Sequence, residues 1–320
     1  MAQKILITPR TFGTIDPEPL ELLRNQGYEL VLNPFGRLLT EKEMMELIVD
    51  VDGVIVGLDP VTETVIKAAP KLKIISKYGI GVDNIAVDFA TQQKIMVTNT
   101  PGANSLAVAE LTMGLILDVA RQISYSDRRL RQNQWGRYQG FELKGKTIGL
   151  VGTGQIGKEV AVRAKGFGMK ITGHDLKPDY EWARTVEAVY LPLDELLSTA
   201  DIVSLHLPLT DDTYHLIGER ELALMKKTAI LINTARGGIV DEKALIQALE
   251  KKAIAGAGLD VYEQEPPTDS PLRTLDNVVL TSHIGAHTFE AISRMGRMAA
   301  ENVVAGLSGQ RPPYLLNAIQ

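Results

Sequence analysis

The feature that most constrains this chain of 320 residues is a strand, a glycine-rich turn and a helix that follow one another over residues 147–167. Residues 147–151 form an apolar run typical of a buried parallel strand. Gly152, Gly154 and Gly157 follow with the spacing Gly-x-Gly-x-x-Gly, and apolar side chains then recur at helical intervals. This order of elements is the context in which such a spacing binds a dinucleotide, and it predicts a Rossmann domain.

Each glycine of the turn has a separate physical role. Gly152 permits the tight turn, Gly154 lets the backbone approach a pyrophosphate because it has no Cβ, and Gly157 allows close packing of helix and strand. The helix that follows begins with free N–H groups and a partial positive charge, which favour phosphate groups.

An acidic residue follows the turn where a dinucleotide site requires one. The next apolar run, at residues 170–173, ends in His174 and Asp175, and Asp175 lies about 20 positions after Gly152. A carboxylate at this place binds the ribose 2′-hydroxyl of NAD and repels the 2′-phosphate of NADP. We therefore expect NAD as the cofactor.

Composition excludes several classes of function. A net charge of −5 gives no electrostatic attraction to nucleic acid or to an anionic membrane. The chain has no cysteine, which excludes disulfides, thiolate catalysis and cysteine metal ligands and fits a cytoplasmic location. No membrane span is expected, because Glu110 and Asp118 interrupt the longest apolar helical pattern. No His, Asp or Glu spacing is typical of a metal site, so we expect no metal.

Alternating strand and helix patterns predict two doubly wound α/β domains. The strand candidates of the first domain are residues 4–8, 28–32, 53–56 and 73–77. Those of the second are residues 147–151, 170–173, 201–205, 229–233, 255–259 and 278–281. Six strands complete a Rossmann sheet, and the final helical pattern has no strand of its own, so it is expected to pack on the first domain. We predict a Rossmann NAD-binding domain of residues 100–288, inserted in a substrate-binding domain of residues 1–99 and 289–320.

Three ionisable side chains follow the last three predicted strands. Arg236, Glu265 and His283 lie shortly after the carboxyl ends of these strands, outside which open α/β sheets bind their ligands. Arginine binds a carboxylate with two hydrogen bonds, and histidine transfers a proton near neutral pH. A neighbouring glutamate favours the imidazolium and fixes the ring tautomer. The set predicts chemistry on a hydroxy acid.

A glycine-rich turn in the first domain is a candidate anion site. Gly79, Ile80 and Gly81 follow the run at residues 73–77 and precede a predicted helix. Free N–H groups at such a turn would bind a substrate carboxylate. Among the other histidines, His206 is expected to line the cofactor cleft, whereas we interpret His215 and His287 as structural.

Together these motifs resemble the D-isomer-specific 2-hydroxyacid dehydrogenase family and, within it, the phosphoglycerate dehydrogenases. The matching segments cover nearly the whole chain, at residues 79–85, 99–111, 145–157, 233–241, 258–267 and 283–286. The resemblance implies hydride transfer between NAD and a small D-2-hydroxy acid, in a cleft between a Rossmann and a flavodoxin-like domain. It also implies a homodimer formed through the cofactor domain, with the helix after Asn104 at the interface.

The resemblance gives each candidate residue a role. Arg236 would orient the acid, His283 would donate or accept the proton, and Glu265 would support His283. The cofactor would be bound by Ile80, Gly152, Gly154, Gln155, Ile156, Gly157, Asp175, His206, Leu207, Thr234, Ala235, Asp260, Gly285 and Ala286. The substrate would be bound by Lys77, Tyr78, Gly79, Gly81 and Asn104.

The chain departs from phosphoglycerate-specific members at Gly57, where these often carry arginine. Lys77 and Arg137 are the cations that could replace it. A glyoxylate or hydroxypyruvate reductase is therefore an open alternative. So is an NADH-sensing, corepressor-like binding protein, because such relatives can retain the same three ionisable residues. A formate dehydrogenase would be expected to carry glutamine in place of Glu265.

Overall fold

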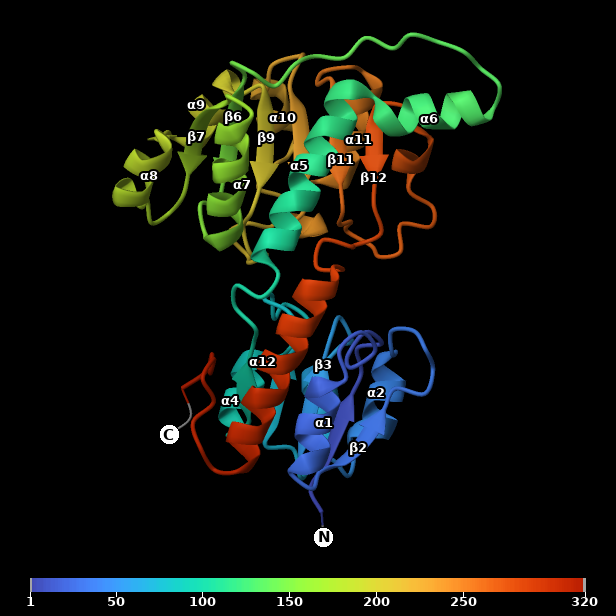
Figure 1. Cartoon of the computed structure of the whole chain (residues 1–320), viewed down its shortest axis with the longest axis vertical. Coiled ribbons are helices and arrows are strands. Elements are labelled where there is room, and N and C mark those ends of the chain that lie inside the picture. Colours follow the sequence, from blue (N-terminus) through green and yellow to red (C-terminus); the bar gives the residue numbers. More distant parts are fainter. Residues whose placement is uncertain (1, 319–320) are drawn as a thin grey trace. The chain divides into compact units, whose positions relative to one another are not determined.

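The computed structural model describes residues 2–318, which form two compact units (Figure 1). The first unit contains the residues up to Asn104 and those from Ala286 on, and the second extends from Ser105 to Gly285. The sequence prediction placed these boundaries after residues 99 and 288. No helix in the described part of the chain is long and apolar enough to cross a lipid bilayer.

The first unit contains a five-stranded parallel sheet with the strand order β2-β1-β3-β4-β5. Its strands are β1 (Lys4–Ile7), β2 (Glu29–Leu32), β3 (Gly53–Val56), β4 (Ile74–Lys77) and β5 (Met96–Thr98). This is the flavodoxin-like order that the resemblance implied. Four strands were predicted; the fifth, β5, is only three residues long, which is too short to show a period.

Helices cover both faces of this sheet. They are α1 (Glu18–Asn25), α2 (Glu41–Ile48), α3 (Glu63–Lys67), α4 (Val87–Gln92) and α12 (Phe289–Leu307). Side chains alternate between the faces, so Leu6 packs with α2 and α3, whereas Ile5 and Ile7 pack with α1 and α12. The last helix therefore belongs to the first unit, as its lack of a strand predicted. Thr40 and Glu43 form a capping box at the start of α2.

The second unit contains a seven-stranded parallel sheet with the order β12-β11-β10-β9-β6-β7-β8. Its strands are β6 (Thr147–Val151), β7 (Lys170–His174), β8 (Val189–Tyr190), β9 (Ile202–Leu205), β10 (Ile230–Asn233), β11 (Gly256–Leu259) and β12 (Val278–Leu280). The order is that of a Rossmann sheet with one strand added at an edge. All six predicted strands are formed, and the seventh, β8, was missed because its two residues carry no readable pattern.

Helices also cover both faces of the second sheet. They are α5 (Ser105–Arg121), α6 (Ile123–Arg131), α7 (Gln155–Gly166), α8 (Tyr180–Val186), α9 (Leu193–Thr199), α10 (Glu219–Leu224) and α11 (Glu242–Glu250), with short 3-10 turns η1 (Gly237–Ile239) and η2 (Pro271–Thr274). One apolar core joins α5 and α7 to the sheet, and another joins α9, α10 and α11 to the opposite face. The connection between α5 and α6 passes through Gln122, which has a left-handed backbone.

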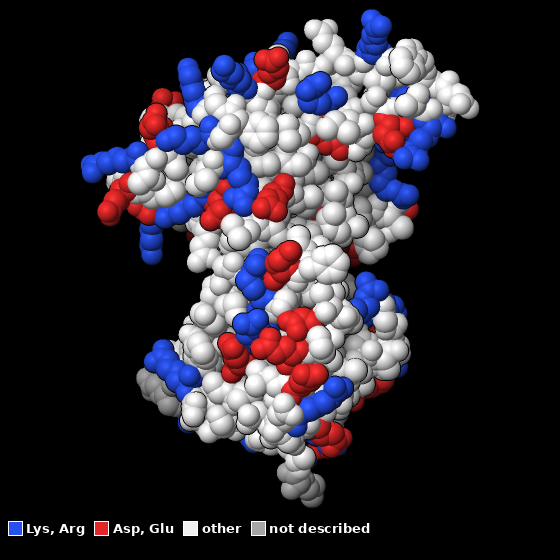
Figure 2. Space-filling model, in the orientation of Figure 1, with Lys and Arg blue, Asp and Glu red and all other residues white. Residues whose placement is uncertain are grey.

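Charged side chains of both signs are interspersed over the surface. Figure 2 shows lysine and arginine alternating with aspartate and glutamate over the face in view, without a large field of one sign. This distribution agrees with the modest net charge of −5. It offers no basic stripe of the kind that binds nucleic acid on the face shown.

Candidate active site

Arg236, Glu265 and His283 lie beyond the carboxyl ends of β10, β11 and β12, which are neighbours in the sheet. His283 and Glu265 are in contact, with 2.7 Å between Nδ1 of the imidazole and Oε2 of the carboxylate. Their side chains are 27% and 29% exposed, so a ligand can reach both. Because Nδ1 is engaged by Glu265, Nε2 is the ring nitrogen left to meet a substrate.

The turn that carries His283 is held by a buried carboxylate. His283 has a left-handed backbone with a φ of 54°, a conformation that a side chain with a Cβ adopts at a cost. Asp260 is 1% exposed and accepts hydrogen bonds from the N–H groups of Ile284 and Gly285, both at 2.8 Å, and from the hydroxyl of Thr281 at 2.6 Å. Asp260, predicted from the resemblance to bind the cofactor, therefore fixes the turn on which His283 sits.

The loop after β11 presents Glu265. The N–H of Tyr262 donates to Oε1 of Glu265 at 3.2 Å, and the Tyr262 hydroxyl donates to the carbonyl of Thr281 at 2.6 Å. Burial raises the pKa of Tyr262, so its phenol stays neutral at physiological pH. Tyr262 thus ties the loop of Glu265 to the end of β12, which precedes His283.

Arg236 is positioned by an asparagine at the end of β10. The side chain of the buried Asn233 donates to the carbonyl of Arg236 at 2.8 Å and accepts from the N–H of Ala235 at 3.0 Å. The next residue, Gly237, packs directly on the peptide that joins Tyr262 to Glu263, and a Cβ there would lie 2.0 Å from the carbonyl oxygen of Tyr262. The Arg236 segment and the Glu265 loop are therefore in direct backbone contact.

The glycine turn after β6 has the geometry that a pyrophosphate needs. Gly152 has a φ of 95°, and a Cβ there would lie 2.5 Å from the carbonyl oxygen of His206. A Cβ on Gly157 would lie 2.3 Å from the carbonyl oxygen of Gly152, whereas one on Gly154 would meet nothing within 4 Å. Gly152 and Gly157 thus permit close packing, and Gly154 borders open space, as their predicted roles require. Gln155 and Ile156 begin α7 at this turn.

Asp175 lies beside the glycine turn at the end of β7. Burial alone would raise its pKa, but hydrogen bonds from the N–H groups of Lys177 and Thr153 and from the Thr153 hydroxyl outweigh burial and lower it. The carboxylate is therefore charged at neutral pH, as binding to a ribose diol requires. The Thr153 hydroxyl also lies 2.7 Å from the hydroxyl of Tyr190 in β8.

Other predicted cofactor residues line the same edge of the sheet. The ring of His206 lies near the glycine turn, with Nε2 2.9 Å from the Ser204 hydroxyl, and burial lowers the pKa of His206 to about 3, so the ring is neutral. Leu207 also lies beside the turn, since a Cβ added to Gly152 would be 3.0 Å from Cδ2 of Leu207. The Thr234 hydroxyl lies 2.9 Å from the Thr112 hydroxyl of α5, and Thr234 is buried.

Two predictions about the glycine turn of the first unit are wrong. The N–H of Gly79 was expected to be free for a carboxylate, but it donates to the hydroxyl of Thr100 at 3.1 Å. The turn does not open a helix either, since α4 begins only at Val87. Ile80 and Gly81 remain candidates for the anion site.

The remaining predicted substrate residues of the first unit have different surroundings. Tyr78 is in the core, with its hydroxyl donating to the carbonyl of Ile292 at 3.2 Å, and burial raises the pKa of Tyr78 to about 12. Lys77 is 3% exposed, and its Nζ lies 2.6 Å from both the carbonyl of Gly57 and Oδ1 of Asn84. The side-chain oxygen of Asn104 is buried without a hydrogen-bond partner among the described residues, which fits an acceptor awaiting a ligand donor.

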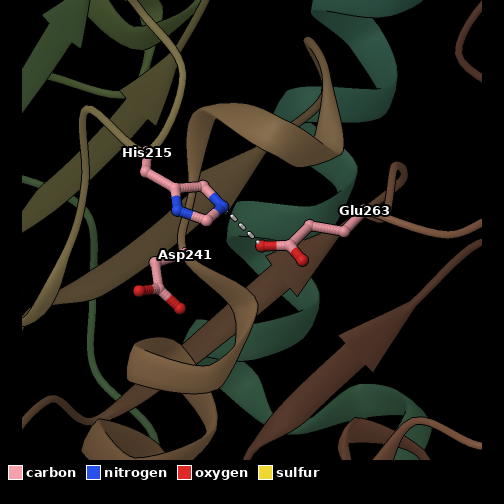
Figure 3. A group of neighbouring side chains, drawn as sticks. All are labelled: His215, Asp241 and Glu263. Atoms are coloured by element: carbon pink, nitrogen blue, oxygen red, sulfur yellow. Dashed lines mark hydrogen bonds and ion pairs between the residues drawn. The ribbon is translucent and has the colours of Figure 1, made fainter.

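A second cluster of ionisable side chains contains His215, Asp241 and Glu263 (Figure 3). Their ligand atoms lie within 4.8 Å of one another, and Nε2 of His215 is 2.8 Å from Oε1 of Glu263. No spacing in the sequence indicated this group, and His215 was interpreted as structural. The three residues come from separate segments, so no local spacing could reveal them.

Replacing Asp260 with alanine tests the role of this carboxylate in holding the turn of His283. Asp260→Ala leaves two backbone N–H groups and one hydroxyl without their acceptor. We expect the free energy of unfolding to fall by about 3 kcal/mol in urea denaturation. Asp269→Ala, which removes an exposed carboxylate of a nearby loop, is the control and should change stability by less than about 0.5 kcal/mol. Equal stability of the two variants would contradict the role given to Asp260.

Comparisons with known proteins agree with this geometry. Residues 113–285 match the family model described as "D-isomer specific 2-hydroxyacid dehydrogenase, NAD binding domain". A glyoxylate reductase from Korarchaeum cryptofilum is 46% identical over 318 residues, which cover 97% of this chain and 96% of that protein. A D-3-phosphoglycerate dehydrogenase from Methanocaldococcus jannaschii is 47% identical over 283 residues, which cover 87% of this chain and 54% of that protein.

Among solved structures, the D-lactate dehydrogenase of Aquifex aeolicus, in complex with NAD and lactic acid, superposes with a TM-score of 0.86. It is 30% identical, and the match covers 99% of this chain and 100% of that one. The chain therefore belongs to the D-isomer specific 2-hydroxyacid dehydrogenase family and is an NAD-dependent oxidoreductase that acts on 2-hydroxy acids.

Proposed function

We propose that this protein is a glyoxylate reductase, which uses NADH to reduce a small, unphosphorylated 2-oxo acid. The observation that carries the proposal is the environment of Lys77 and Gly57. A phosphate group is best bound by an arginine, which offers two parallel hydrogen bonds. The residue after β3 is glycine, and the buried Nζ of Lys77 contacts the Gly57 carbonyl and Asn84. Lys77 is therefore engaged within the protein, and Gly57 supplies no guanidinium for a phosphate dianion.

The relatives support the same choice. Relatives named glyoxylate reductase from Korarchaeum cryptofilum, Thermococcus litoralis and Thermofilum pendens are 46%, 46% and 47% identical to this chain. Specificity for phosphoglycerate, favoured by the sequence resemblance, is the alternative that the substrate experiment below tests.

Each ionisable residue has one task in this reaction. When bound, NADH supplies the hydride. Arg236 binds the carboxylate of the 2-oxo acid and so fixes the carbonyl carbon in place. Nε2 of His283 donates a proton to the carbonyl oxygen, while the Glu265 carboxylate at Nδ1 holds the ring in the required tautomer and stabilises the imidazolium. In the reverse direction, the same nitrogen accepts the proton of the hydroxy acid.

The residues of the second unit fit a bound NAD. The open space at Gly154 and the N-terminus of α7 would accept the pyrophosphate, and Asp175 the adenosine ribose. We further assign the N–H groups of Ile80 and Gly81 and the unpartnered oxygen of Asn104 to the substrate.

We also propose a homodimer formed through the second unit. Helix α6 and the segment after it expose large apolar side chains, among them Ile123 and Leu130, each 55% exposed, and Trp135, which is 83% exposed. Such groups mark protein interfaces.

Sedimentation velocity should give about twice the mass of one chain, and Trp135→Ala together with Leu130→Ser should lower that mass at equal concentration. A monomer for the unmodified chain would contradict this proposal.

His283→Ala tests the proton-transfer role of the imidazole. Loss of the proton donor should lower kcat for glyoxylate by about 10²- to 10⁴-fold. The Kd for NADH, measured by fluorescence titration, should stay within about two-fold, because His283 is not assigned to the cofactor. An unchanged kcat would refute the role of His283.

Substrate preference is tested with NADH and a panel of glyoxylate, hydroxypyruvate, pyruvate and phosphohydroxypyruvate. We expect kcat/KM for glyoxylate to exceed that for phosphohydroxypyruvate by at least about ten-fold, a difference of about 1.4 kcal/mol in transition-state binding. Gly57→Arg is the matched variant, since a Cβ there would make only ordinary contacts at 3.6 Å or more, and it should shift the ratio toward the phosphorylated acid.

Two outcomes of the panel would contradict the proposal. Preference for phosphohydroxypyruvate by the unmodified protein would restore the phosphoglycerate alternative. NADH binding without turnover of any acid would favour the NADH-sensing binding protein.

A further inference from the structure

The loop after β11 carries two glutamates, and each hydrogen-bonds a histidine from a different segment. Glu265 contacts His283, and Glu263 contacts His215, with 2.8 Å between Oε1 and Nε2 (Figure 3). Both histidines have a left-handed backbone, with φ values of 54° and 51°. Such strained residues persist only where their surroundings hold them, and they concentrate at functional sites. The proposed reaction uses only one of these two pairs.

The second pair joins three segments of the chain. Oε1 of Glu263 also accepts from the N–H of Glu242, the first residue of α11, at 2.9 Å. The N–H of His215 donates to the carbonyl of Gly238 in η1 at 2.8 Å. One histidine and one carboxylate thereby connect the loop before α10, the segment after Arg236 and the loop of Glu265.

Both carboxylates of the cluster accept hydrogen bonds from within the protein. Oδ1 of Asp241 accepts from the N–H of Ala244 at 3.0 Å and caps α11, and Oε1 of Glu263 has the two partners described above. The side chains of His215 and Glu263 are 32% and 34% exposed. This arrangement is typical of a structural contact, and we call the hydrogen bond between His215 and Glu263 the clamp.

We propose that His215 and Glu263 are positioning residues for catalysis. Their hydrogen bond holds the loop so that Glu265, two residues after Glu263, faces Nδ1 of His283. The inference rests on the proposed roles of Glu265 and His283. Displacement of a supporting group by about 1 Å can lower a rate by about 100-fold, so loss of the clamp acts on the chemical step.

The test is His215→Asn, because asparagine tolerates a left-handed backbone and is too short to reach Glu263. We expect kcat to fall by about ten-fold or more, while the Kd for NADH stays within about two-fold. His215→Gln, which can donate from its own Nε2, should restore kcat to within about three-fold of the unmodified protein. The control is Lys165→Ala near the C-terminus of α7, which removes a 2.9 Å ion pair between Lys165 and Glu187. It should change neither kcat nor the Kd for NADH.

A second experiment, in a variant with an altered Glu265, distinguishes the positioning of Glu265 from a general loss of stability. We introduce His215→Asn into the Glu265→Gln variant and compare the double variant with Glu265→Gln alone. The kcat should fall by less than about two-fold, because the carboxylate that the clamp positions is already absent. The same ten-fold loss in both backgrounds would overturn the proposal, as would an unchanged kcat in the unmodified background. If the unmodified protein reduces no 2-oxo acid, the proposed function fails instead, which is a distinguishable result.

A bound cation is the competing account of the cluster. Treatment of the unmodified protein with EDTA should leave kcat and the unfolding temperature unchanged. Loss of activity that added Zn²⁺ or Mn²⁺ restores would show that His215, Asp241 and Glu263 hold a metal, and it would overturn the clamp.

Discussion

The hydrogen bonds that Asp260 accepts at the end of β11 are the interactions on which the site depends. A buried carboxylate must be paired or it destabilises the fold, and Asp260 meets this requirement by binding the backbone of the turn after β12. The turn can then keep His283 in a left-handed conformation. Loss of these bonds would release the imidazole from the position at which Glu265 meets it.

The segments that carry Arg236, Glu265 and His283 lie at one edge of the sheet because β10, β11 and β12 are adjacent and parallel. Parallel strands place their carboxyl ends at one edge, so segments almost 50 positions apart in the chain are brought to the same edge of the sheet. Gly237 then brings two of the three loops into backbone contact, since its lack of a side chain lets it rest on the peptide after Tyr262. The geometry of the candidate site is thus set by the sheet and by contacts between its loops, while the helices contribute the apolar cores on both faces of the sheet.

Much of this arrangement was predictable from the sequence. The strands with long apolar runs were found, as were Gly152, Gly154 and Gly157, whose backbone geometry agrees with their predicted roles. The strands β5 and β8 were missed because two or three residues show no period. Contacts between distant residues were also hidden, which is why Gly79 was expected to have a free N–H and why Glu263 was not identified as the partner of His215.

The candidate site contains two kinds of residue, those proposed to bind the substrate and those that hold them in place. A structure of the protein with NADH and oxamate, a non-reactive analogue of a 2-oxo acid, tests this most directly. We expect Nε2 of His283 within about 3 Å of the amide oxygen of oxamate and the guanidinium of Arg236 on its carboxylate. An imidazole turned away from the ligand, with Glu265 bound to another partner, would contradict the assignment of the active site.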